Sequence, residues 1–134
     1  MTDSAILQKY QEQYVNTLTP GELLVLLYNE ALKNINKAIF FINNKKIMEA
    51  HNCIIKAETI FLSLMGDLDF NYPVSKNLLT LYEYLYNSLV NANMEKNTET
   101  LTAVLNMTTE LRDAWQQAEK ICRTGSPKPL ERSI

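Results

Sequence analysis

The sequence predicts an all-α protein, an antiparallel up-down-up-down four-helix bundle, and three observations support this. First, apolar side chains recur at spacings of three and four residues along four long stretches, which is the pattern of helices that pack on one face. Second, only three Gly and four Pro occur in 134 residues, and they leave long segments uninterrupted. Third, no strand pattern competes. Short links between the stretches predict that consecutive helices run in opposite directions.

The first helix is expected from about Pro20 to Ile42, and its start carries several agreeing signals. Thr19 can cap the helix, Pro20 fits the first helical position, and Glu22 can reach back to the Thr19 amide, which makes a capping box. Capping is local chemistry that any helical protein can use, so these signals indicate a fold and not a function. The structural motif residues that we assign to this start and to the core are Thr17, Thr19, Pro20, Glu22, Leu23, Tyr28 and Trp115.

Three more helices are expected after the first. The second extends from about Ile47 to Gly66, the third opens at Pro73, and the fourth begins with Asn97 or Thr98 as its cap and ends near Arg123. The chain then divides into an N-terminal cap segment (residues 1–16), the bundle (17–123) and a flexible tail (124–134). Both cysteines fall within apolar stripes, so we expect them to be buried and reduced; they are Cys53 and Cys122.

Composition argues against two classes of partner. The net charge is −2, and no run of basic residues is longer than Lys45-Lys46, so nucleic acid is not an expected partner. The longest apolar run is far shorter than the roughly 20 residues that a membrane-spanning helix needs, and the N-terminus lacks the pattern of a secretion signal. We therefore expect no membrane insertion and a cytoplasmic location.

The sequence predicts no enzyme activity, no metal and no cofactor. His51 is the single histidine, and its two-residue spacing from Glu49 and from Cys53 points these side chains to different sides of a helix. Cysteine catalysis would again depend on His51, which we interpret as a surface histidine. The only glycine near a helix start is Gly21, so the chain has no loop that could cradle a phosphate.

The apolar residues that are informative about function lie outside the core stripes. Two neighbouring helices that each carry a second apolar line would enclose a shallow exposed groove, a feature typical of binding sites. The alternative is that some of these residues are buried under the chain's own N-terminal segment or are isolated exposures, which are normal. The predicted binding residues are Met48, Ile55 and Leu62 on the second helix and Leu79, Tyr86 and Val90 on the third.

The N-terminal segment is amphipathic and too short to be a stable helix alone. Leu7, Tyr10 and Tyr14 recur at spacings of three and four residues. We hypothesise that these three side chains rest in an apolar groove when no partner is present and are displaced by a ligand that offers more apolar contact.

Several short motifs follow one another along the chain: Val15-Asn16-Thr17, Thr19-Pro20-Gly21-Glu22-Leu23, Leu26-Leu27-Tyr28-Asn29, Leu78-x-x-Leu81-Tyr82 and Leu111-Arg112-Asp113-Ala114-Trp115. Together with Tyr10, their order resembles the flagellar secretion chaperones of the FliS family over nearly the whole chain. Two departures are Leu18, where the family commonly has Ala, and Asn29-Glu30, where Asp-Gly is common.

The resemblance implies a cytoplasmic, non-enzymatic chaperone for flagellin. Such a protein binds the disordered C-terminal segment of flagellin, prevents premature polymerisation and delivers its client to the flagellar type III export apparatus. A component of the export gate would be a second partner, and the segment containing Tyr10 would cover part of the site. The free chain is expected to be a monomer or a weak dimer. The alternative function is a structural adapter that self-associates through its surplus apolar stripes.

Overall fold

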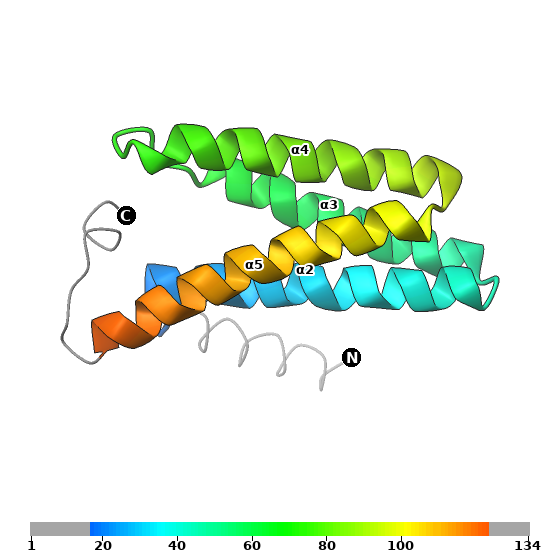
Figure 1. Cartoon of the computed structure of the whole chain (residues 1–134), viewed down its shortest axis with the longest axis horizontal. Coiled ribbons are helices and arrows are strands. Elements are labelled where there is room, and N and C mark those ends of the chain that lie inside the picture. The colour runs from blue at the N-terminus through cyan, green and yellow to red at the C-terminus, as the bar shows by residue number, and fades with distance from the viewer. Residues whose placement is uncertain (1–16, 124–134) are drawn as a thin grey trace, which may run out of the picture.

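The structure, a computed structural model, describes residues 17–123, which form four helices (Figure 1). They are α2 (Pro20–Asn43), α3 (Ile47–Gly66), α4 (Val74–Glu95) and α5 (Thr98–Arg123). The cap segment predicted at residues 1–16, with Leu7, Tyr10 and Tyr14, and the tail predicted at 124–134 lie outside the described residues.

The helices form a closed ring of packed neighbours. Each helix packs on the next one in the chain, and α2 also packs on α5. The connections at 44–46, 67–73 and 96–97 are short, so consecutive helices run in opposite directions. In Figure 1, α5 crosses α2 obliquely and diverges from α4 toward the end of the bundle where α4 begins. The predicted up-down-up-down bundle is confirmed.

The start of α2 is held by its cap and by α5. Thr19 Oγ1 accepts a hydrogen bond from the Glu22 amide at 3.1 Å, and the Thr19 amide donates to Glu22 Oε1 at 3.1 Å, which confirms the predicted capping box. Gly21 allows a close approach of α5, because a Cβ there would lie 1.7 Å from Glu119 Oε1. The other oxygen of Glu119 accepts a hydrogen bond from Thr19 Oγ1 at 3.3 Å.

The core lies where the apolar stripes of the four helices meet. Tyr28 and Trp115, which the sequence assigns to the core, are both buried. Thr108 is the polar member of the α5 stripe, and its hydroxyl donates to the Val104 carbonyl at 2.7 Å, so its burial leaves no donor unsatisfied. The largest fully buried side chains also include Ile35, Ile54, Phe61, Tyr82, Leu85, Leu89, Leu101 and Val104.

One cysteine differs from the sequence prediction. Cys53 is buried as expected, but Cys122 is exposed. Its stripe is buried as far as Ala118, and the next residue, Glu119, already contacts the start of α2. Cys122 follows almost one turn later, so α5 has passed the start of its partner helix and none of the helices α2 to α4 covers the thiol.

Candidate functional site

Two contacts fix the register of α3 against α4. Asn93 Nδ2 lies 3.0 Å from His51 Nδ1, and the ring centroids of Phe61 and Tyr82 are 6.1 Å apart. His51 is half-buried at this contact, which corrects the interpretation that it is a surface histidine. Since the helices are antiparallel, Ile55 lies level with the stretch of α4 between Tyr86 and Val90.

The six predicted binding residues lie along the boundary between these two helices. Residues three, four or seven apart share a helix face. On α4, Val90 and Tyr86 precede Asn93 by three and seven residues, so their row follows the side that contacts His51. On α3, Ile55 follows His51 by four residues, so its row borders the same boundary. We call Met48, Ile55, Leu62, Leu79, Tyr86 and Val90 together the apolar seam.

The two rows of the apolar seam differ in exposure. The α3 row is open to solvent, with exposed fractions of 68% for Met48, 41% for Ile55 and 49% for Leu62. The α4 row is half-buried, and Tyr86 packs against the core. A partner on the seam would therefore contact mainly side chains of α3.

One residue that extends the α4 row was not among the predicted binding residues. Met94 is 79% exposed and follows Val90 by four residues, so it continues the row toward the end of the helix. Met94 lies within the polar run Asn93 to Asn97, but α4 continues through most of this run and ends at Glu95. The four-residue spacing from Val90 was the signal that could have found it.

A buried carboxylate lies next to the apolar seam. Glu58 is only 8% exposed, and Ile55 and Leu62 flank it at three and four residues along α3. Burial raises the pKa of the Glu58 carboxyl above its usual value, while the charge of His51 opposes that change. Within residues 17–123 this carboxylate has no hydrogen-bond or ion-pair partner.

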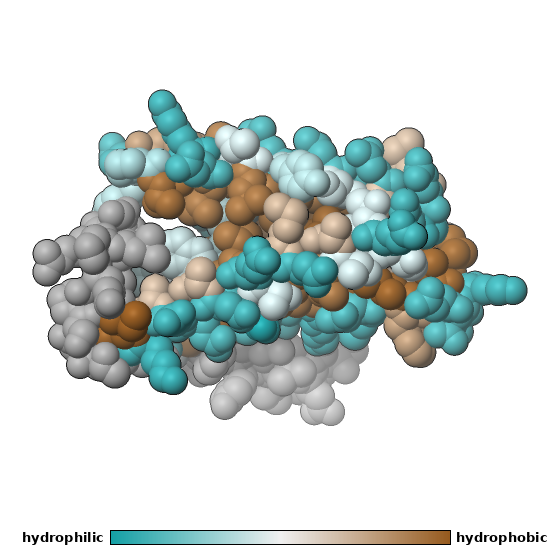
Figure 2. Space-filling model, viewed as in Figure 1, coloured by the Kyte–Doolittle hydropathy of each residue, from teal (hydrophilic) through white to brown (hydrophobic). Residues whose placement is uncertain are grey.

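A hollow of about 460 Å³ opens at the end of the bundle where α4 begins. It lies between the first turns of α2 and α4, the end of α3 and Trp115 of α5, where Figure 1 shows α4 and α5 diverging. Figure 2 shows hydrophobic residues between these two helices on the face in view. Tyr82 also lines this hollow, while its hydroxyl oxygen lies 2.5 Å from that of Tyr28. The apolar lining residues include Leu23, Leu24, Leu27, Leu64, Leu68, Val74 and Leu78.

A second hollow of about 430 Å³ lies between α2 and α5. Its α2 side is lined by Leu18, Glu22, Val25, Leu26 and Asn29, and its α5 side by Gln116, Glu119 and Lys120. One wall is therefore mainly apolar and the other polar.

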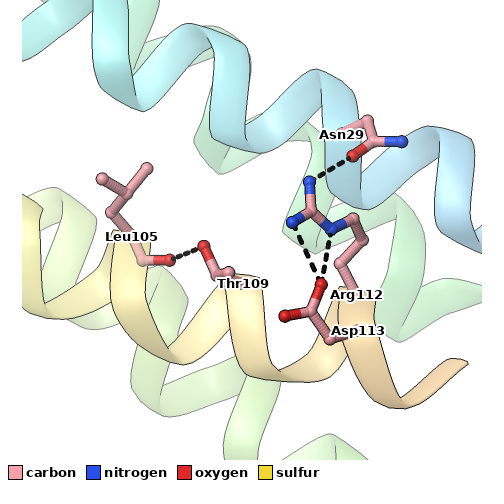
Figure 3. A network of polar contacts seen from close by, with 5 residues as sticks. All are labelled: Asn29, Leu105, Thr109, Arg112 and Asp113. Carbon is pink, nitrogen blue, oxygen red and sulfur yellow. Dashed lines mark hydrogen bonds and ion pairs between the residues drawn. The ribbon is translucent and has the colours of Figure 1, made fainter. Parts of the chain in front are cut away.

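Arg112 joins the two helices next to this second hollow. Its Nη1 donates to Asn29 Oδ1 at 3.0 Å, and its Nη2 pairs with Asp113 Oδ1 at 3.0 Å (Figure 3). The same figure shows Thr109, one turn earlier on α5, with its hydroxyl donating to the Leu105 carbonyl at 2.8 Å. Arg112 thus connects the Leu-Arg-Asp-Ala-Trp motif of α5 to the Leu-Leu-Tyr-Asn motif of α2.

Neither hollow was predicted from the sequence, because the apolar residues at the start of α2 were expected to lie in the core. The run Leu23 to Leu27 is half-buried throughout. Leu23, Leu24 and Leu27 line one hollow, whereas Val25 and Leu26 line the other. Five consecutive apolar residues cannot all face one stripe of a helix, and this was the available signal.

Two further observations concern chemistry and membranes. In the part of the chain that the structure describes, no group of three or more His, Cys, Asp or Glu side chains is placed to hold a metal ion. None of the helices α2 to α5 is long and apolar enough to cross a membrane.

A helical bundle with apolar side chains left outside its core is typical of proteins that bind a partner chain. Comparison with known proteins identifies the family. A family model described as "Flagellar protein FliS" matches residues 3–121. The chain belongs to the FliS family of flagellar secretion chaperones.

Relatives from three bacteria agree with this assignment, and each is named "Flagellar secretion chaperone FliS". The chain is 40% identical to the Bacillus subtilis protein over 109 residues, which cover 81% of this chain and 82% of the relative. It is 26% identical to the Campylobacter jejuni protein, with 87% and 93% covered. Identity to the Salmonella typhimurium protein is 23%, with 79% and 81% covered.

Proposed function

We propose that the protein is a cytoplasmic export chaperone that binds the disordered C-terminal segment of flagellin along the apolar seam. The bound segment is prevented from polymerising early and is delivered to the flagellar type III export apparatus. Membership of the FliS family supports the chaperone role. The observation that carries the choice of site is the row of exposed apolar side chains on α3, namely Met48, Ile55 and Leu62.

The exposed α3 row is suited to bind a disordered segment that folds into a helix. A disordered segment that folds on binding typically buries about 1,000 to 3,000 Å² and loses several kcal/mol to ordering. An amphipathic client helix could lay its apolar face along the α3 row, with anchors at helical spacing. Each fully covered anchor such as Ile55 would contribute about 1.5 to 3 kcal/mol.

The N-terminal segment is proposed to cover part of the site in the free chaperone, with Leu7, Tyr10 and Tyr14 as its contacts. Pro20 and Gly21 line the hollow at the end of the bundle where α4 begins. The N-terminal segment therefore precedes, by only a few residues, an apolar surface that it could cover. Deletion of residues 1–16 should increase the binding of a hydrophobic dye. Unchanged dye binding would argue against this cover.

Once loaded, the chaperone is proposed to present its client to a component of the export gate. Free chaperone should bind that component less tightly than the complex does. Gel filtration of the gate component with loaded and with empty chaperone tests this order of events.

Mixing the protein with a peptide of the flagellin C-terminal segment tests the proposed function. Circular dichroism should show more helix than the sum of the separate components, because the client folds on binding. A scrambled peptide of the same composition is the control and should add no helix. If light scattering instead showed a tight dimer that ignores flagellin, the exposed α3 row would serve self-association, and the structural adapter would be favoured.

A further inference from the structure

Glu58 combines two properties that rarely occur together in a folded protein. Its side chain is more than nine-tenths buried, and its carboxylate has no hydrogen-bond or ion-pair partner among the described residues. The charge of His51, on the same helix, acts on the Glu58 carboxyl, but the imidazole of His51 is itself in hydrogen-bond contact with Asn93 of α4. The acceptor sites of the Glu58 carboxylate are thus left unused by residues 17–123.

Glu58 lies at a position where a bound segment would cover its carboxylate. Ile55 and Leu62 precede and follow it on the same face of α3, and both are exposed. A segment that covers these two side chains must also cover Glu58 and remove the remaining water from its carboxylate. A carboxylate that loses water without gaining a hydrogen bond is strongly unfavourable, so an entirely apolar partner would be penalised there.

We propose that Glu58 is a recognition site within the apolar seam, where its carboxylate accepts a hydrogen bond from a donor group of the bound segment. Suitable donors are amide, hydroxyl and ammonium groups. This inference rests on the proposed function, which takes the bound segment to be the C-terminal segment of flagellin. Glu58 would then select segments that place a donor between two apolar anchors and reject segments that are apolar throughout.

Two substitutions separate recognition from folding. Glu58→Met removes the carboxylate and keeps a side chain of similar length, and Glu58→Gln keeps an acceptor oxygen in the same place. Replacing an unpaired buried carboxylate with an apolar group should leave the melting temperature of Glu58→Met equal to or above that of the wild type. Binding of the flagellin peptide should nevertheless weaken at least tenfold in Glu58→Met and less than threefold in Glu58→Gln. A protein that is no less stable but binds less well cannot be explained by unfolding.

Glu49→Met is the matched control, since it makes the same change at an exposed glutamate on the opposite side of the same helix. Its affinity for the peptide should equal that of the wild type. If Glu58→Met binds the peptide as tightly as the wild type or more tightly, the inference is wrong. If the wild type itself does not bind the peptide, the proposed function fails, which is a distinct result.

A measurement on the wild type keeps the inference testable if Glu58→Met does not fold. The carboxyl ¹³C resonance of Glu58 can be assigned from its absence in Glu58→Gln. Addition of the peptide should shift this resonance as the carboxylate gains a donor. An unchanged resonance at saturating peptide would overturn the inference.

Discussion

The hydroxyl oxygens of Tyr28 and Tyr82 lie 2.5 Å apart in the core and join α2 to α4. These two helices are not neighbours in the ring of packed helices, so the contact links the bundle across its centre. Burial raises the pKa of both phenols above the ordinary tyrosine value near 10.

We predict that the raised pKa values of these two tyrosines make the protein lose stability above about pH 10. In the unfolded chain both phenols lose their protons near pH 10, whereas in the folded chain they keep them, so unfolding releases protons. Their contribution to the free energy of unfolding is fully present below the pKa that tyrosine has in the unfolded chain. It is lost as the pH rises toward the higher pKa values of the folded chain. Above about pH 10 the free energy of unfolding, measured by urea unfolding, should fall by about 1.4 kcal/mol per pH unit for each tyrosine.

Tyr82→Phe is the comparison for this prediction, because one of the two buried phenols is removed. Above about pH 10, the free energy of unfolding of this variant should fall less steeply with pH than that of the wild type, by about 1.4 kcal/mol per pH unit. Equal slopes in the two proteins would show that the buried phenols do not govern alkaline unfolding.

Trp115→Ala should lower the free energy of unfolding by about 3 to 5 kcal/mol. Trp115 is buried, packs in the core and lines the hollow at the end of the bundle, so its loss leaves a cavity. Thermal and urea unfolding measure the effect. A variant that melts close to the wild type would contradict the core role that we assign to this residue.

Asn29→Asp should raise the free energy of unfolding by about 0.2 to 1 kcal/mol. Asn29 Oδ1 accepts a hydrogen bond from Arg112 at 3.0 Å, and an aspartate there would turn this contact into an ion pair between α2 and α5. Asp113 already pairs with Arg112, which keeps the expected gain small. The gain should disappear in 1 M salt; a gain that persists there would not come from the charge.

Gly21→Ala tests the close approach of α5 to the start of α2. An added methyl would displace the Glu119 carboxylate, whereas alanine itself favours a helix over glycine by about 0.5 to 1 kcal/mol. The substitution should therefore stabilise the protein more in a Glu119→Ala background than in the wild type. Equal effects in the two backgrounds, measured by urea unfolding, would mean that Glu119 does not restrict this position.

The fold followed from the sequence because its determinants are local. The capping box at Thr19, the C-terminal end at Gly66 and the cap of α5 all appear where their residues predict them. At α5 the side chain of Asn97 accepts from the amides of Glu99 and Thr100, which chooses Asn97 over Thr98 as the cap. Such signals act within one turn of helix, so no knowledge of the tertiary structure is needed to read them.

The candidate site was only partly predictable, because exposure depends on how far each helix extends past its neighbours. Helical spacing found the exposed row on α3, but it could not show that the α4 row is half-buried. Periodicity also placed Cys122 in a stripe without revealing that α5 ends beyond α2. That the Glu58 carboxylate has no partner among residues 17–123 depends on the packing of two helices, and no pattern in one segment reports that.

The affinity of Ile55→Asp for the flagellin C-terminal peptide tests the central claim most directly. Ile55 is 41% exposed, so the fold should tolerate the charge, which circular dichroism can check. Tyr84→Asp is the control, since Tyr84 is 57% exposed on α4 outside the apolar seam. Isothermal titration should show binding weakened roughly ten- to hundredfold in Ile55→Asp, equivalent to losing one anchor, and unchanged in Tyr84→Asp. Equal affinities for Ile55→Asp and the wild type would contradict the claim that the client binds along the apolar seam.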